Sequence, residues 1–195
     1  MTVSKAEKVL SLFRRFTNQL KRAKKSFSGL ILNTADWVFT MNEPEIKSAG
    51  IVNVDFGLHV TVIQPVNLYH CHIGDNCFIG PFVEIQKGVV IGKGCRIQSH
   101  SFVCELVQIG DECVVSHGVM FINDLFRTGS PAHGDRGLWK ATHIGNRVYI
   151  GSNATILPVT ICDDVVIGAG SVVTSDIQES GIYAGNPAKK LRGLS

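Results

Sequence analysis

Two histidines, 17 residues apart, are the side chains in this sequence best suited to catalysis. His100 stands in the stretch QSHSF and His117 in VSHGV, so each has small or polar neighbours. An imidazole has an ordinary pKa of about 6.5 and can accept a proton near neutral pH. Such a base suits acyl transfer to an amine or a hydroxyl, because the attacking group must lose a proton. Whether the two side chains can act together depends on the elements that position them.

A six-residue repeat surrounds both histidines. Between residues 72 and 124 an aliphatic side chain returns at every sixth position, and a small side chain follows it four residues later. This period fits neither an α-helix nor an alternating strand, and it predicts a repeat architecture. Hexapeptide repeats build an all-β parallel β-helix, in which three short strands form one coil and residue i lies over residue i+18. The repeated inward positions are Ile73, Ile79, Ile85, Ile91, Ile97, Val103, Ile109, Val115 and Phe121.

Stacking by 18 residues predicts which side chains are neighbours. His117 is expected over Ser99 and His100 under Gly118, so the two imidazoles should lie side by side on adjacent coils. The same spacing of 18 residues predicts that three cysteine side chains point inward and form one column. We interpret this column as core packing rather than as a metal site, because the chain has no CxxC pair. Its members are Cys77, Cys95 and Cys113.

The pattern divides the chain into four segments. Residues 1–29 read as a basic amphipathic helix, which packs on the body or a neighbouring subunit, or rests on an anionic membrane surface. Residues 30–60 are expected to cap the first coil, and the β-helix is expected over residues 61–178, with one long loop at 125–142. A C-terminal tail, residues 179–195, follows.

The loop interrupts an otherwise regular repeat, and long loops in compact domains usually serve function. Asn123 and Asp124 stand at its mouth, and the stacking places Asn123 over Glu105. The two residues are candidates to hold a substrate. The alternative for them is an Asx turn that begins the loop.

Composition excludes several classes of protein. The body outside the basic first segment has more acidic than basic residues, so it has no nucleic-acid footprint. No apolar stretch approaches the roughly 20 residues of a membrane span, and no signal peptide is evident. A soluble, cytoplasmic protein is therefore expected.

The repeats, the loop and the tail together resemble the left-handed β-helix acyltransferases that use acyl-CoA. The stretches RIQSHSF, QIGDEC, VMFINDLF, GSNATILP, GAGSVV and AGNPAKKL are most similar to sugar-nucleotide N-acyltransferases that act on 3-amino sugars. The resemblance implies a left-handed coil and a homotrimer with active sites between subunits. It also implies acetyl-CoA as donor without a metal ion, and a nucleotide-linked amino-deoxy sugar as acceptor, a precursor of cell-surface polysaccharide such as lipopolysaccharide O-antigen.

This resemblance also implies roles for particular residues. His100 and His117 are the catalytic candidates, although many relatives have an asparagine at the position matching His100, where it contacts the sugar amino group. His133 and Arg136 are further loop candidates. For the acceptor we expect contacts from Glu84, Asn123, Asp124, Arg127, Trp139 and Lys140. For the CoA donor we expect the turns or side chains of Ser152, Ala169, Gly170, Lys189, Lys190 and Arg192.

Three other functions remain open at this point. The first is O-acetyl transfer to a sugar or serine hydroxyl, which the histidines would serve equally well. The second is a γ-carbonic anhydrase, which needs an HxxxxH pair, whereas Ile122 stands where His117 would need its partner. The third is a non-catalytic binding protein on the same scaffold.

Overall fold

The computed structural model of the chain describes residues 14–15 and 44–194. The helix expected over residues 1–29 lies outside this part, apart from Arg14 and Arg15, which are helical and exposed. Contacts divide the chain into two units, Met1–Ile46 and Lys47–Ser195. The second unit carries the fold described below.

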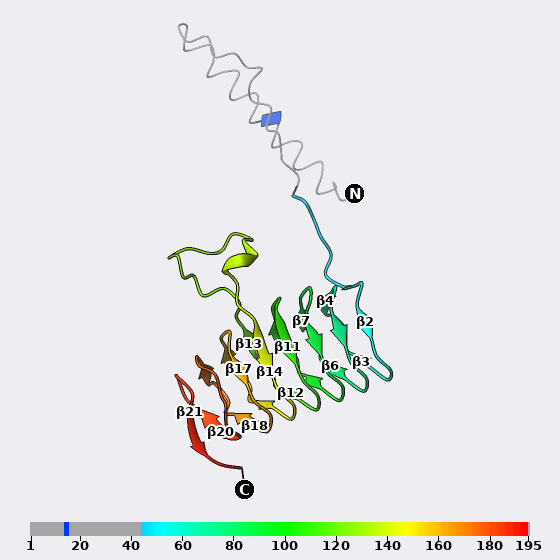
Figure 1. Ribbon diagram of the computed structural model, residues 1–195. Helices are drawn as coiled ribbons and strands as arrows, with labels where there is room; N and C mark the ends of the chain where they lie inside the picture. The colour runs from blue at the N-terminus through cyan, green and yellow to red at the C-terminus, as the bar shows by residue number, and fades with distance from the viewer. Residues whose placement is uncertain (1–13, 16–43, 195) are drawn as a thin grey trace, which may run out of the picture. The chain divides into compact units, whose positions relative to one another are not determined.

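Residues 51–192 form an all-β parallel β-helix with three faces (Figure 1). Face A has seven strands: β1 (Ile51–Val52), β4 (Asn67–Tyr69), β7 (Glu84–Ile85), β10 (Phe102–Val103), β13 (Met120–Phe121), β16 (Thr155–Ile156) and β19 (Val172–Val173). Face B has six: β2 (Asp55–Phe56), β5 (His72–Ile73), β8 (Val90–Ile91), β11 (Val107–Ile109), β14 (Thr142–Ile144) and β17 (Thr160–Ile161). Face C has eight: β3 (Thr61–Val62), β6 (Phe78–Ile79), β9 (Arg96–Ile97), β12 (Val114–Val115), β15 (Tyr149–Ile150), β18 (Val165–Ile167), β20 (Gly181–Ala184) and β21 (Lys189–Arg192).

The strand register confirms the stacking expected from the repeat. On face C, Ile79 pairs with Ile97 and Ile97 pairs with Val115, which are steps of 18 residues. The repeated aliphatic side chains point inward and are buried, as are the three thiols Cys77, Cys95 and Cys113. The core is therefore a continuous column of aliphatic and small side chains, and it leaves chemistry to the faces, the corners and the loop.

Two boundaries differ from the sequence expectation. The first coil already begins at Ile51, inside the segment expected to be a cap, and its apolar residues are partly exposed, with no coil beneath them among the described residues. The stretch GIVNVDF indicates short strands, but the six-residue pattern is faint there, so these strands are expected in a cap rather than in the first coil. At the other end, the tail adds β20 parallel to β18, and β21 then turns back antiparallel to β20.

Three corners join the faces, and each is named by the faces it joins. The C–A corner includes the turns at residues 81–82, 99–100, 117–118, 152–153 and 169–170. The A–B corner includes the turns at 86–88 and 104–106 and the loop from 122 to 141. The B–C corner includes the turns at 74–76, 92–94, 110–112, 145–147 and 162–164.

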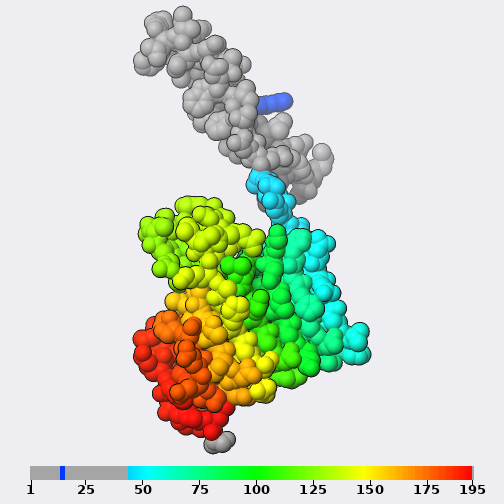
Figure 2. All heavy atoms as spheres, viewed as in Figure 1, coloured from blue at the N-terminus to red at the C-terminus, as the bar shows by residue number. Residues whose placement is uncertain are grey.

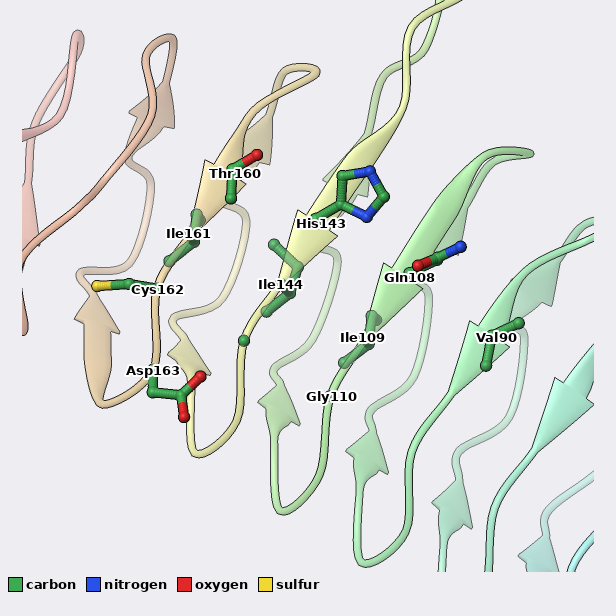
Figure 3. Close-up of a pocket in the computed structure, with 11 residues that line it drawn as sticks. Val90, Gln108, Ile109, Gly110, His143, Ile144, Thr160, Ile161, Cys162 and Asp163 are labelled. Atoms are coloured by element: carbon green, nitrogen blue, oxygen red, sulfur yellow. The ribbon is translucent and has the colours of Figure 1, made fainter.

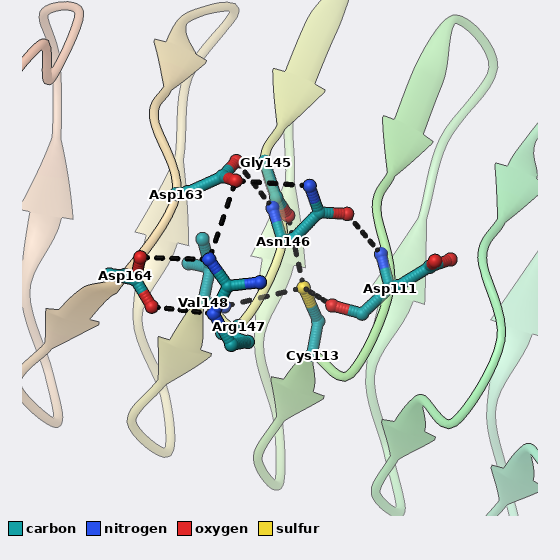
Figure 4. A network of polar contacts seen from close by, with 8 residues as sticks. All are labelled: Asp111, Cys113, Gly145, Asn146, Arg147, Val148, Asp163 and Asp164. Atoms are coloured by element: carbon teal, nitrogen blue, oxygen red, sulfur yellow. Dashed lines mark hydrogen bonds and ion pairs between the residues drawn. The ribbon is translucent and has the colours of Figure 1, made fainter.

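The B–C corner is held by a polar network between successive coils (Figure 4). The Asn146 side chain accepts a hydrogen bond from Asp111 N–H at 2.8 Å and donates one to Asp163 Oδ2 at 3.1 Å. Arg147 binds both carboxylate oxygens of Asp164, at 2.7 and 2.8 Å. The Cys113 thiol donates to Gly145 O at 3.1 Å, so the buried thiol column also contributes to this corner.

We predict that Gly110→Ala destabilises the β-helix. A Cβ at Gly110 would lie 2.7 Å from Gly145 O, and the backbone of the next coil can move little. Overpacking of this kind costs about 1–3 kcal/mol. Thermal unfolding should show it as a lowered midpoint. Gly50→Ala, whose Cβ would meet nothing within 4 Å, serves as the control and should leave the midpoint nearly unchanged.

A second prediction concerns acid stability at the B–C corner. The bidentate hydrogen bond from Arg147 lowers the pKa of Asp164 below its ordinary value. A lowered folded-state pKa stabilises the protein above the unfolded-state pKa, about 3.9, and this stabilisation disappears as pH falls through the folded-state pKa. Asp164→Asn removes that titration, so its free energy of unfolding should fall less between pH 5 and acidic pH. Denaturant titrations across this range test the prediction, and parallel curves for the two proteins would contradict it.

Candidate active site

Both predicted catalytic histidines lie in turns of the C–A corner. His100 has a φ of +63°, in the left-handed region, and the residue stacked above it is Gly118, with a φ of +68°. Both histidines are exposed. None of the five turns carries an Asp, Glu, Lys or Arg, so the imidazoles are the titratable side chains of these turns.

His117 is oriented by the coil beneath it. Its Nδ1 lies 2.8 Å from the Ser99 hydroxyl, as the stacking arithmetic predicted for these two residues. In the tautomer in which Nδ1–H donates to Ser99 Oγ, Nε2 keeps its lone pair and can accept a proton. The arrangement therefore presents one imidazole nitrogen as a base and fixes the ring through the other.

His100 is engaged differently. Its ring stacks on Phe82 of the preceding coil, with ring centroids 4.9 Å apart and an interplanar angle of 15°. Within residues 44–194, no hydrogen bond joins His100 to His117. The two histidines lie in adjacent turns, but each side chain contacts the coil beneath it rather than the other imidazole.

The backbone candidates for the donor share this corner. Ser152 lies in the turn after β15, and Ala169 and Gly170 lie in the turn after β18. The Gly170 N–H already donates to Ser152 O at 2.8 Å, so that amide serves the coil-to-coil ladder. The remaining donor candidates lie on β21. Lys189 and Arg192 are exposed there, whereas Lys190 Nζ is paired with Glu179 Oε2 at 2.7 Å.

Asn123 and Asp124 hold the mouth of the loop at the A–B corner. Asn123 Nδ2 donates to Glu105 O at 3.2 Å, which matches the predicted stacking. The two carboxylate oxygens of Asp124 accept hydrogen bonds from Phe126 N–H at 2.9 Å and Ala132 N–H at 2.8 Å. The first of these bonds is the Asx turn that the sequence left as an alternative.

The rest of the loop stands out from the coils as a lobe (Figures 1 and 2). A short 3-10 helix, η1 (Arg136–Leu138), lies within it, capped by the Asp135 side chain. Arg127, His133 and Lys140 are exposed, and Trp139 is half-buried.

One ion pair that sequence reasoning missed ties this lobe to the coil. Arg136 binds Glu105 Oε2, an atom that is fully buried. Glu105 belongs to a polar cluster on neighbouring coils, in which Gln86 Nε2 donates to Glu84 Oε1 at 2.9 Å. Burial, and then the carboxylates of Glu84 and Glu105, raise the pKa of Tyr69 above its ordinary value. The sequence placed Glu105 under Asn123, at the start of the loop. It could not identify Arg136 as the ionic partner of Glu105, because the loop has no repeat that relates its residues to the coil.

The histidines and the loop thus lie at opposite edges of face A. His100 precedes β10 at the C–A corner, and Glu105 follows it at the A–B corner. At about 3.3 Å per residue, up to about 16 Å of chain separates the two positions. Within one chain, Glu84 on β7 lies between the two edges, and the predicted residues do not converge on one point.

A groove of about 440 Å³ lies on face B (Figure 3). Val90, Gln108, His143 and Thr160 project from four successive strands along it. None of the predicted site residues lines this groove. No Lys or Arg lines it either, so it does not suit the phosphate groups of CoA or of a nucleotide.

The described residues provide neither a cluster of metal ligands nor a membrane-spanning helix. Over residues 14–15 and 44–194, no group of three or more His, Cys, Asp or Glu side chains is arranged to hold a metal ion. Over the same residues, no helix is both long and apolar enough to cross a membrane.

The fold and its corner site define a hexapeptide-repeat β-helix protein, and comparisons with known families agree. Residues 70–105 match the bacterial transferase hexapeptide family, and residues 142–175 match the hexapeptide repeat of succinyl-transferase. The chain therefore carries the repeats of these transferases. The resemblance inferred from the sequence is confirmed at this level.

The curated relatives include a galactoside O-acetyltransferase and several bifunctional GlmU proteins. The chain is 32% identical over 144 residues to the bifunctional protein GlmU of Clostridium beijerinckii. The aligned region covers 71% of the chain and 28% of GlmU. The chain is also 34% identical over 134 residues to galactoside O-acetyltransferase of Escherichia coli. That alignment covers 63% of the chain and 64% of the enzyme. The chain thus spans less than half the length of these GlmU proteins, 28% of one and 43% of another.

Solved structures share the fold. A hexapeptide-repeat acetyltransferase from Vibrio cholerae, complexed with acetyl-CoA, aligns with a TM-score of 0.53 and 25% identity over 64% of this chain and 71% of its own. A variant of the N-acyltransferase AntD from Bacillus cereus, in complex with dTDP and coenzyme A, aligns with a TM-score of 0.63 and 22% identity over 74% of this chain and 86% of its own.

We predict that Arg136→Ala loosens the loop without unfolding the β-helix. The change removes the cation from the buried Glu105 oxygen, so the lobe loses its ionic tie to the coil. Local opening should become more frequent, and chymotrypsin should cut after Phe126 about fivefold faster or more. Mass spectrometry would follow the cleavage. Lys140→Ala removes an exposed cation of the same loop away from the cleaved bond and is the control, and equal rates for the two variants would contradict the prediction.

Proposed function

We propose that the protein is an acetyltransferase that moves the acetyl group of acetyl-CoA to the amino group of a nucleotide-linked amino-deoxy sugar. One observation carries the proposal: His117, fixed through Nδ1 by Ser99, presents Nε2 at a corner of a transferase-type β-helix. The similarity to acetyltransferases supports the donor. The choice of an amine as acceptor rests on the stretches that resemble sugar-nucleotide N-acyltransferases.

The reaction is a direct transfer in a ternary complex. The neutral amine attacks the thioester carbonyl carbon, a C–N bond forms, and the C–S bond breaks as the CoA sulfur leaves. His117 Nε2 takes the proton that the amine loses and returns it to the departing thiolate. His100 lies in the adjacent turn and completes the histidine pair on the acceptor side.

The donor would bind along the C–A corner and β21, and the acceptor would bind at Glu84, Asn123 and the loop. The turns at Ser152, Ala169 and Gly170 continue the histidine corner and would pair with the pantetheine arm. On β21, Lys189, Lys190 and Arg192 would neutralise the CoA phosphates. For the acceptor, Glu84, Asn123 and the loop residues Asp124, Arg127, Trp139 and Lys140 supply polar contacts.

The homotrimer with left-handed coils is what the resemblance implies, and the separation of these regions fits a site that is shared between copies. The loop and the histidines lie at opposite edges of face A, so the predicted residues of the two regions do not meet within one chain. A neighbouring copy would bring its loop to the histidine corner of the first chain. The site would then use both regions, and the product would be a cytoplasmic precursor of cell-surface polysaccharide.

One specific observation favours O-acetyl transfer as the second candidate. The relative with 34% identity is a galactoside O-acetyltransferase, and an oriented imidazole serves a hydroxyl as well as an amine. The two functions are separated by measuring CoA thiol release from acetyl-CoA with UDP- and dTDP-linked amino sugars and with their hydroxy counterparts. Release with the amino sugars alone supports our proposal, whereas release with the hydroxy sugars alone supports O-transfer. No release with any acceptor would refute both.

We predict that His117→Ala lowers the transfer rate at least about 100-fold, because general-base catalysis contributes on this scale. Ser99→Ala should cause a smaller loss, since the base remains but its ring is no longer held. Steady-state thiol release at saturating acetyl-CoA provides the measurement. His143→Ala removes an exposed imidazole from face B and should leave the rate within about twofold of the starting protein. A His117→Ala variant with a near-normal rate would remove His117 from the mechanism.

A further inference from the structure

Phe82 and His100 form an exposed pair of stacked rings at the C–A corner. Phe82 is 55% exposed, so it contributes little to the core. Both residues have left-handed backbones, with φ values of +60° and +63°, at a position that later coils fill with Gly118, Asn153 and Gly170. Other turns of the β-helix also place non-glycine residues in this conformation, so the pair stands out by its exposed aromatic side chains rather than by its backbone. The ring pair therefore points to a role outside the fold.

Directly above the ring pair, the next coil contributes no side chain. Gly118 has no side chain there, and a Cβ added to it would fall on Asn153 Oδ1. The Asn153 amide therefore reaches from the next coil over the position above His100. It is exposed, and no hydrogen bond of its side chain occurs within residues 44–194. The result is a floor of two stacked rings with an amide donor and acceptor at its rim.

The charge of the two corners narrows the chemistry of the ligand. The B–C corner carries Asp111, Arg147 and Asp163, whereas the turns of the C–A corner carry no Asp, Glu, Lys or Arg. A phosphate or a carboxylate would find no fixed charge beside the rings. A neutral ring with an apolar face and polar groups at its edge fits, and a pyranose ring has this form. Its C–H face can pack on an aromatic ring, and its hydroxyls can bind an amide.

We propose that Phe82 and His100 are the stacking platform for the sugar ring of the acceptor and that Asn153 binds a hydroxyl at its edge. This inference rests on the proposed function and names the subsite that the function needs. The reacting amine must reach His117, which lies in the turn next to His100. The part of the acceptor on the rings is thus the sugar that bears the amine. The nucleobase lies farther away, beyond a ribose and a diphosphate.

The test compares ligands with and without the sugar. Calorimetry without acetyl-CoA measures the dissociation constants of dTDP and a dTDP-linked amino-deoxy sugar, and of the matching UDP pair. Phe82→Leu keeps an apolar side chain but removes the ring. It should weaken binding of the sugar nucleotide about fivefold and leave that of dTDP or UDP unchanged. Asn153→Ala should weaken binding of the sugar nucleotide by a similar factor and leave binding of dTDP or UDP unchanged. Tyr149→Leu, an exposed aromatic residue on face C, is the control and should change neither.

A second comparison separates stacking from proton transfer at His100. His100→Phe keeps an aromatic ring, so it should retain the extra affinity for the sugar, whereas His100→Ala should lose it. Transfer by His100→Ala should fall at least about tenfold, mainly through the KM of the acceptor. If His100→Phe binds the sugar normally but transfers no acetyl group, then His100 also acts as a base.

The possible results distinguish a failure of the stacking platform from a failure of the proposed function. Equal weakening of dTDP and its sugar conjugate by Phe82→Leu would mean that the nucleobase occupies the rings, and it would overturn the inference. Normal binding and transfer in Phe82→Leu would also overturn it while the function stands. A selective loss of sugar binding without any thiol release would support the platform and refute the function. If the unmodified protein binds none of the four ligands, both fail.

Discussion

The structure depends on one constraint: every coil must hydrogen-bond to the coil beneath it in register. The backbone of the parallel strands leaves no freedom to shift, because a slip of one residue would turn the inward aliphatic column to solvent. Ile79, Ile97 and Val115 show the resulting order on face C, where each pairs with the next. A position in the repeat therefore determines whether a side chain packs, faces solvent or occupies a corner. Chemistry can be added only where this order leaves side chains free.

The two best-defined corners use that freedom differently. At the B–C corner the polar side chains bind the adjacent coil, as Asn146 and Arg147 do, and they serve the fold. At the C–A corner, Ser99 and Phe82 contact the histidines of the next coil, and the opposite edges of those imidazoles face solvent. The left-handed turn favours glycine or asparagine, so placing Phe82 and His100 there costs about 1 kcal/mol for each residue. The B–C corner bears a similar cost at Glu112 and Arg147, so what distinguishes the C–A corner is that its rings are exposed and, among the described residues, bind no polar group of the adjacent coil other than Ser99.

The sequence predicted contacts that the backbone ladder determines, and it missed contacts that side-chain rotamers or the loop determine. His117 over Ser99 and Asn123 over Glu105 followed from spacing alone, because stacked positions meet whatever their rotamers. His100 lies in the predicted turn, yet its ring turned toward Phe82, and spacing cannot give that choice. The pairing of Arg136 with Glu105 was equally invisible, since no period relates a loop residue to a coil. The strands from Ile51 were expected in a cap rather than in the first coil, because their apolar residues lack the regular six-residue phase.

The geometry of face A limits what one chain can do with these parts. A β-helix filled by its own side chains has no interior site, so its ligands must lie along an edge or between molecules. His117 and Arg136 belong to opposite edges, and the strand between them is too rigid to bend them together. A loop that is tied to its own coil through Asn123 and through the ion pair of Arg136 cannot cross that face, but it can reach outward. The features that immobilise the loop are thus the features that make it suited to complete the site of a neighbouring copy, and this is why we propose that the acceptor is held between chains.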